Sequence, residues 1–232
     1  MNEQSATSVQ ELLNQNDCCL SNKPMVLDSM EQLRDIGALF YSRGWSLGTS
    51  SNYSVVVNKD PLRLLMTASG KDKRSLRDED FLIVDEHAKS VIANKEVPSS
   101  ETLLHMVAVQ NSGAGAVLHT HSVWSTLLSD VHFASDGFNI SGYEMLKGLS
   151  GIKSHEENVW VPIFDNSQNM AELSGFVKDR MRNQPETLKW GYLLRNHGLY
   201  TWGRDLNEAR RHVEIFEFLF EVLGRKLSLG LK

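Results

Sequence analysis

Segments with a two-residue hydrophobic period alternate along most of this chain with segments whose hydrophobic period is close to 3.6 residues. Tyr53, Val55 and Val57 alternate with their neighbours as in a strand, whereas Leu206 and Val213 belong to an apolar stripe at helical spacing. No long linker or repeat interrupts this alternation. Interleaved strands and helices therefore predict one α/β domain with helices layered on a central sheet.

The same periodicities predict the individual elements. Helices are predicted over residues 28–43, 100–111, 122–129, 167–182 and 204–227. Strands are predicted over residues 52–60, 62–70, 114–121, 158–165 and 187–198, with two more short strands between 80 and 92. Asp28 and Glu31 resemble the start of the first helix and Gly44 its end, and Asp205 and Glu208 resemble the start of the last helix.

The first 24 residues are polar and rich in Asn, Gln and Ser, which predicts a flexible extension (1–24) before the folded domain (25–232). A formal net charge of −5, with no block of Lys and Arg, argues against a nucleic acid as partner. There is no signal-peptide pattern and no run near the roughly 18 apolar residues of a membrane span. We therefore expect a cytoplasmic protein that does not enter membranes.

Two histidines one residue apart end the small, apolar segment GAGAVLHTHSVW (113–124). In an extended strand His119 and His121 project on the same side, while Thr120 points away. The pair is a candidate for two ligands of one metal ion. A His-x-His pair alone is more often structural, so the metal interpretation needs a third ligand.

His197 is the candidate third ligand, because it follows an apolar strand and precedes Gly198, where the backbone can turn sharply. Three converging imidazoles would leave a coordination position open for substrate, as in catalytic sites. The other histidines are interpreted as surface groups or groups with local partners: His87, His105, His132, His155 and His212. His105 has one alternative role, because it lies one helical turn from Glu101 and such a pair can share a metal.

Three segments rich in small polar residues and glycine lie at predicted strand ends or helix starts: GTSSNYS (48–54), ASGKDK (68–73) and PSSE (98–101). Exposed backbone N–H groups and hydroxyls at such places can bind a phosphate. Ordinary turns require the same residue types, so both interpretations stay open.

Glu101 and Glu144 are candidates for moving protons beside a bound cation. The alternatives are that Glu101 complements a helix dipole and that Glu144 pairs with Lys147 on a solvated face. The residues alone favour these alternatives.

Five segments in this order, GTSSNYSV, TASGKD, PSSE, GAVLHTHS and RNHGLYTWG, resemble the class II aldolase and adducin-related family over roughly residues 28–224. The resemblance implies a three-layer α/β/α single domain with a central, mostly antiparallel sheet. It also implies a homotetramer, with a metal site at a subunit boundary and a phosphorylated ketose as substrate. Residues 25–232 would then form the catalytic domain.

The resemblance assigns His119, His121 and His197 to the metal site and Glu101 to the acidic position beside it. The matching phosphate-binding segments contain Asn52, Ser69, Gly70, Lys71, Ser99 and Ser100. Adducin-like members lack the metal histidines, so their presence here implies an enzyme. Zn²⁺ is the leading cofactor, with one ion per subunit, although other divalent metals suit the same ligands.

Within the family, ASGKDKRSL, GYEMLKGL and LLRNHGLYTWG are most similar to a dehydratase branch that acts in methionine salvage on a methylthio-substituted ketose phosphate. This similarity implies a hydro-lyase with Glu144 as the acid/base residue. Some relatives carry Cys at the position of Glu101, so its role as metal ligand, acid/base or substrate contact stays open. The alternatives are a sugar-phosphate aldolase or pentulose-phosphate 4-epimerase of the same fold, and a non-catalytic adducin-like assembly protein.

Overall fold

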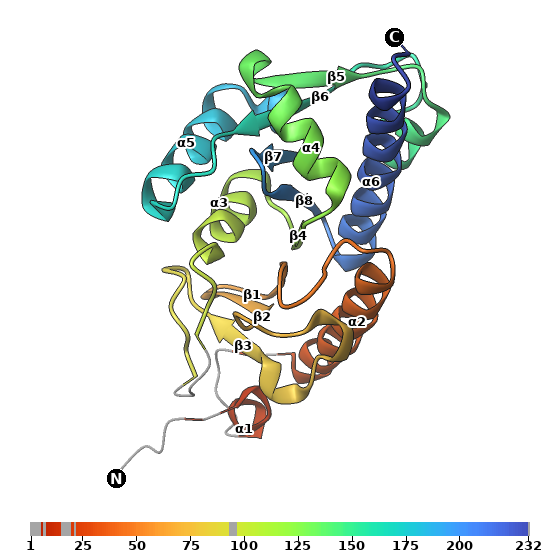
Figure 1. The fold of residues 1–232 in the computed structure, drawn as a ribbon. Coiled ribbons are helices and arrows are strands. Elements are labelled where there is room, and N and C mark those ends of the chain that lie inside the picture. Colours follow the sequence, from red (N-terminus) through yellow and green to blue (C-terminus); the bar gives the residue numbers. More distant parts are fainter. Residues whose placement is uncertain (1–5, 7, 15–19, 21, 93–96, 232) are drawn as a thin grey trace.

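A computed structural model describes residues 6, 8–14, 20, 22–92 and 97–231 of the chain (Figure 1). The helices are α1 (Val9–Asn14), α2 (Lys23–Ser42), α3 (Thr102–Ser112), α4 (Val123–Val131), α5 (Met170–Asn183) and α6 (Leu206–Ser228). The strands are β1 (Asn52–Lys59), β2 (Leu62–Thr67), β3 (Phe81–Val84), β4 (Ala116–Thr120), β5 (Gly137–Ile140), β6 (Val159–Phe164), β7 (Gly191–Leu194) and β8 (Gly198–Gly203).

The eight described strands form one sheet in the order β3-β2-β1-β4-β8-β7-β6-β5. Only β6 and β7 run parallel, and every other neighbouring pair is antiparallel. The predicted mostly antiparallel sheet is therefore confirmed. The pairing of β4 with β1 and β8 brings the start of β1, the end of β4 and the turn between β7 and β8 together, at the same end of these central strands.

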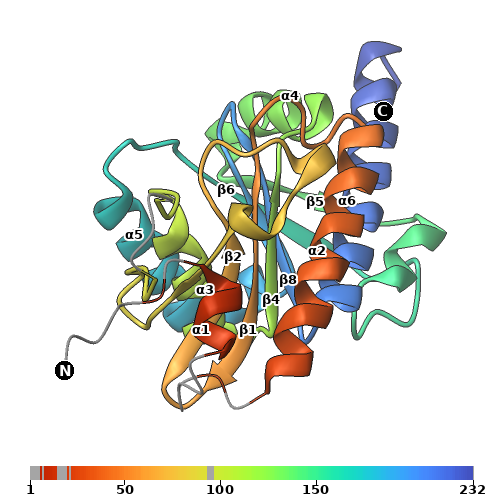
Figure 2. The same ribbon diagram turned by 90° about the horizontal axis from the view of Figure 1, so that it is seen from below.

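Helices cover both faces of the sheet, which confirms the three-layer architecture (Figure 2). In β1, Tyr53 and Val55 pack in one core cluster with residues of α2 and α6. The alternate residue Val56 packs in a second cluster with α3 and α5, because successive side chains lie on opposite faces of a strand. A third cluster joins α4 and the second half of α6 to β5, β6 and β7.

The first long helix begins earlier than predicted. Helix α2 starts at Lys23, and the side chain of Asn22 accepts a hydrogen bond from the backbone N–H of Met25 at 3.1 Å. Pro24 lies in the first turn, where the missing N–H is not needed. Asp28 and Glu31 are therefore surface residues within the helix and do not form its start. The start of α6 is as predicted, since Asp205 caps the N–H of Glu208 at 2.8 Å.

Two strands were missed and one predicted strand is wrong. Strand β5 is only four residues long, and β8 begins at Gly198, where the strand predicted over residues 187–198 ends. That prediction covers only β7 and the turn after it. The second strand predicted between residues 80 and 92 is reduced to an isolated bridge between Val84 and Ser90, because the segment after β3 turns at once.

Part of the predicted N-terminal extension packs against the domain. Val9, Leu12 and Leu13 of α1 are buried in the same core cluster as α2 and β3. Much of this segment (1–5, 7, 15–19 and 21) lies outside the described residues, so the division at residue 25 and the flexibility of residues 1–24 stay predictions. Among the described helices, none has both the length and the apolar composition needed to cross a membrane.

Candidate metal centre

Strand β4 presents two histidines on the face of the sheet that is covered by α3. His119 lies opposite Asn52 of β1 and Tyr200 of β8, and its ring stacks on the Tyr200 ring with a centroid distance of 3.9 Å. His121 follows the last residue of the strand and points the same way, as its side-chain contact with His119 shows. Thr120 points to the other face and donates a hydrogen bond to Glu217 of α6 at 3.2 Å.

His197 lies in the turn between β7 and β8. Asn196 before it has a positive φ of 53°, and the His197 N–H donates to the carbonyl of Leu194 at 3.1 Å. The carbonyl of His197 accepts a hydrogen bond from Thr126 of α4, also at 3.1 Å. The backbone N–H and carbonyl of His197 are thereby both held, close to the end of β4.

The three rings converge through their Nε2 atoms. These atoms lie 2.6 Å apart for His119 and His121, 3.0 Å for His121 and His197, and 3.3 Å for His119 and His197. Tetrahedral Zn–N bonds of roughly 2.0–2.1 Å would place neighbouring nitrogens at about 3.3 Å. Among the described residues, this is the group of three that could hold a metal ion.

The electrostatics of the triad also fit a cation. Burial lowers the pKa of His119 well below its usual range and that of His121 to about 4, so both rings are neutral near pH 7. The Nδ1 atom of His119 is 2.9 Å from the carbonyl of Leu199, to which it donates, and its Nε2 therefore carries a lone pair. Lone pairs at such short distances repel one another unless a proton or a cation lies between them.

Glu101 brings a carboxylate to the triad from the residue before α3. Its Oε1 is 3.3 Å from Nε2 of His197, and its Oε2 is 3.8 Å from Nε2 of His119. The carboxylate lies at the start of the helix but makes no capping hydrogen bond to it. Asn52 instead donates a hydrogen bond to Oε2 at 2.6 Å.

A polar pocket of about 240 Å³ opens beside the triad. It is lined by Thr49, Ser50, Ser51, Asn52, Ser69, Gly70, Ser99, Ser100, Glu101 and His121. The three predicted polar segments therefore meet in space, and Asn52, Ser69, Gly70, Ser99 and Ser100 are all part of the lining. Lys71 is outside this lining, and its ammonium pairs with Asp80 at 3.2 Å.

The model of one family, described as the class II aldolase and adducin N-terminal domain, matches residues 31–223. The chain belongs to this family. Methylthioribulose-1-phosphate dehydratases of Marinobacter nauticus and Pseudomonas aeruginosa are 43% and 46% identical to it over 192 and 201 residues. These matches cover 82% and 86% of this chain and 90% and 95% of the two relatives.

Solved structures of class II aldolases share the fold. An L-fuculose 1-phosphate aldolase has a TM-score of 0.72 at 19% identity and covers 92% of this chain and 91% of its own. The L-fuculose-1-phosphate aldolase of Thermus thermophilus has a TM-score of 0.69 at 22% identity, with 89% of this chain and 100% of its own covered. At this identity the likeness concerns the architecture.

Glu144 lies apart from the triad. It begins a short 3₁₀ helix (Glu144–Gly148), its side chain is 69% exposed, and it pairs with Lys147 at 2.5 Å and with His155 at 3.1 Å. It is not part of the pocket lining among the described residues. Within one chain, the geometry matches the predicted pairing with Lys147 and does not bring Glu144 to the histidines.

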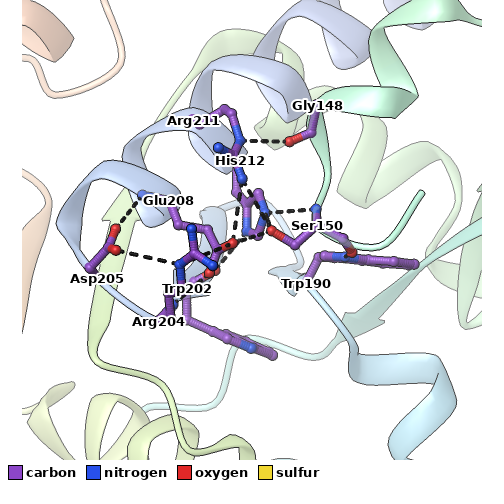
Figure 3. A network of polar contacts seen from close by, with 9 residues as sticks. All are labelled: Gly148, Ser150, Trp190, Trp202, Arg204, Asp205, Glu208, Arg211 and His212. Carbon is purple, nitrogen blue, oxygen red and sulfur yellow. Dashed lines mark hydrogen bonds and ion pairs between the residues drawn. The ribbon is translucent and has the colours of Figure 1, made fainter. Parts of the chain in front are cut away.

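A polar network fixes the segment after Glu144 to the start of α6 (Figure 3). The N–H of Ser150 donates to Nε2 of His212 at 3.1 Å, and its hydroxyl donates to Glu208. Arg211 donates to the carbonyl of Gly148 at 2.9 Å, and Trp190 donates to the carbonyl of Ser150 at 2.8 Å. Three side chains of α6 and that of Trp190, just before β7, thus hold a segment that has little regular structure of its own.

The sequence patterns missed a second group of polar residues behind Glu101. Ser54 and His105 are fully buried, and the ring of His105 contacts both Ser54 and Asn52. His105 therefore does not share a metal with Glu101, because both of its ring nitrogens have other partners. The available signal was the polar pair Asn52 and Ser54, which alternates with Tyr53 and Val55 in a buried strand.

Proposed function

We propose that this chain catalyses the metal-dependent dehydration of 5-methylthioribulose 1-phosphate to 2,3-diketo-5-methylthiopentyl 1-phosphate, a step of methionine salvage. The observation that carries the proposal is the convergence of three imidazole nitrogens beside a pocket of hydroxyls and backbone N–H groups. The choice of substrate comes from two relatives that are named for this activity and match more than four fifths of the chain.

In this proposal, His119, His121 and His197 hold one Zn²⁺ ion per subunit. Three neutral nitrogens and a nearby carboxylate suit zinc, and they also accept iron, manganese or cobalt. When bound, the cation would supply positive charge beside the C2 carbonyl and C3 hydroxyl of the ketose, where negative charge develops as C3 loses its proton. Glu101 would lie beside this charge as a fourth ligand, an acid/base group or a substrate contact.

The polar pocket would bind the phosphate of the substrate. Ser69, Gly70, Ser99 and Ser100 provide hydroxyls and backbone N–H groups close to His121. Lys71 would add long-range attraction for the anion from outside the lining. Binding at the phosphate fixes the position of the sugar and supplies energy away from the reacting carbons.

Glu144 would move the proton. It would take the proton from C3 and return it to the hydroxyl that leaves C4 as water, after which the enol ketonises to the 2,3-diketone. Because its side chain is largely exposed and lies outside the pocket of its own chain, we propose that Glu144 acts at the site of a neighbouring subunit. This arrangement requires an oligomer with the site at a subunit boundary, which fits the homotetramer that the family resemblance implies. The cytoplasmic location also stays a prediction.

The test incubates zinc-loaded protein with 5-methylthioribulose 1-phosphate and follows the diketone by mass spectrometry. L-fuculose 1-phosphate and ribulose phosphates serve as matched substrates. Diketone formation from the methylthio sugar alone is the expected result. Cleavage of fuculose phosphate would instead indicate a sugar-phosphate aldolase, and epimerisation of a pentulose phosphate would indicate a 4-epimerase. No turnover, together with no stoichiometric metal after purification, would favour an adducin-like assembly protein.

A further inference from the structure

His105 of α3 is a fully buried histidine whose two ring nitrogens both have side-chain partners. Its Nδ1 is 2.7 Å from the hydroxyl of Ser54, and its Nε2 contacts the amide oxygen of Asn52. Burial lowers its pKa to about 3, so the ring is neutral near pH 7. A neutral imidazole has one donor and one acceptor, and both are used here.

The direction of each hydrogen bond in this group is determined. The carboxylate of Glu101 only accepts, so the amide nitrogen of Asn52 must face it and donate at 2.6 Å. The amide oxygen of Asn52 then accepts from Nε2–H of His105. Nδ1 of His105 is left as the acceptor for the Ser54 hydroxyl. The chain of donors therefore runs in one direction, from Ser54 through His105 and Asn52 to Glu101.

Apolar side chains of α3 and β1 lie on the same face as this polar group. On α3, Leu104 and Ala108 pack in the apolar cluster between the helix and the sheet, and so does Val56, the next residue of β1 on the same face. Burying polar groups among such neighbours costs free energy unless each is hydrogen-bonded. A pair of apolar side chains would pack as well between α3 and β1, but it would leave the amide oxygen of Asn52 without a donor.

We propose that His105 and Ser54 are positioning residues, which hold the carboxylate of Glu101 against the histidine triad by orienting the amide of Asn52. The inference rests on the proposed metal centre and adds residues that touch neither metal nor substrate. With Oε2 held by Asn52, Oε1 faces Nε2 of His197 at 3.3 Å. Asn52 thus links His105 to Glu101, because its amide oxygen faces His105 and its amide nitrogen faces Glu101.

A double-mutant cycle tests whether His105 acts through Glu101. Zinc affinity is measured by competition with a chelator for the wild type, Glu101→Gln, His105→Leu and the double variant, and kcat and KM are measured alongside. Residues that orient metal-site groups typically alter affinity or activity by roughly 10- to 100-fold. We expect His105→Leu to lose about tenfold in zinc affinity or in kcat, with less than threefold change in KM. The double variant should be no worse than Glu101→Gln.

Two further variants separate positioning from folding. His105→Gln keeps a donor near the place of Nε2 and should recover most of what His105→Leu loses. Ser54→Ala should show a smaller loss than His105→Leu. Met106→Leu, a volume-conserving change at the next buried position of α3, is the control and should leave both readouts unchanged. Thermal unfolding checks that each variant is folded.

The outcomes distinguish this inference from the proposed function. Additive losses in the double variant, or no loss in either readout for His105→Leu, would overturn the positioning role. A failure of His105→Gln to recover would do the same. If zinc binding shows the expected coupling but no substrate is dehydrated, the proposed function is wrong and the positioning role stands.

Discussion

Gly198 lies against the carbonyl of Thr120, the residue between two of the candidate metal ligands. A Cβ atom at Gly198 would stand 2.0 Å from the Thr120 oxygen and 3.2 Å from Cδ2 of His121. The close approach lets β8 begin directly beside the end of β4, one residue after His197. The absence of a side chain at Gly198 is therefore a condition for the three imidazoles to meet.

Replacing Gly198 by Ala should weaken both the fold and metal binding. The added methyl group meets backbone, which cannot rotate away, so β4 and β8 must separate at the triad. We expect a loss of about 2 kcal/mol or more in unfolding free energy, measured by urea denaturation, together with reduced zinc affinity. The matched control is Gly175→Ala in α5, where a Cβ meets nothing within 4 Å. This control should gain up to about 1 kcal/mol. Equal behaviour of the two variants would contradict the argument.

His119→Ala should reduce metal content and activity together. The substitution removes one of the three converging imidazoles. This ring is the one whose Nδ1 is held by the Leu199 carbonyl. We expect metal content, measured by elemental analysis, to fall well below one ion per chain, and activity to fall at least about a hundredfold. His87→Ala, at a side chain that is 73% exposed, is the control. Unchanged metal content in His119→Ala would count against the assignment.

Glu144→Gln should separate proton transfer from metal binding. The side chain is exposed and its ion pairs with Lys147 and His155 contribute little to stability, so fold and zinc content should be retained. We expect kcat to fall by roughly 10²- to 10⁴-fold. Glu156→Gln, at an exposed side chain in the same segment, is the control and should leave kcat and zinc content unchanged. Full turnover by Glu144→Gln would remove Glu144 from the mechanism.

Mixing the two inactive variants tests the proposed action between subunits. If Glu144 of one chain serves the triad of another, co-refolded His119→Ala and Glu144→Gln chains should regain part of the activity that neither variant has alone. Measured activity equal to the sum of the two separate variants would place the reaction within one chain.

Glu217 predicts a specific pH dependence of stability. Burial raises its pKa from 4.5 to about 7, opposed by hydrogen bonds from Ser122 and Thr120. The native state therefore holds a proton that the unfolded chain releases. This contribution is complete below pH 4.5 and is lost as pH rises to about 7. It amounts to at most about 3 kcal/mol.

Glu217→Gln should remove this dependence, because the amide stays neutral at every pH. The difference in unfolding free energy between Glu217→Gln and the wild type, from urea titrations, should shift in favour of the variant between pH 5 and pH 8. Glu214→Gln, at a side chain that is 40% exposed on the same helix, is the control. A difference that does not change with pH would show that Glu217 does not hold a proton in the native state.

The local patterns were sufficient where the cause of structure is local. The period of two placed His119 and His121 on one face, and the cap at Asp205 with the apolar stripe after it located α6. The same reasoning misplaced the start of α2, because Pro24 was taken as a break and not as a residue of the first turn. It also continued the strand at β7 through the turn at Asn196 and missed β8, since this turn depends on a positive φ that the residue type permits but does not require.

The chain by itself determined which residues could bind a metal and a phosphate, because these are properties of imidazoles, hydroxyls and glycines. Only the tertiary structure decided that the candidate metal ligands and the candidate phosphate-binding residues lie side by side. Strand β4 must pair with β8 for His197 to reach His119, and with β1 for Asn52 to lie beside both. The tertiary structure also decided that His105 faces Asn52 rather than a metal, and that Glu144 lies outside the pocket of its own chain. Such contacts depend on which strands become neighbours, and that choice is made by packing of the whole core.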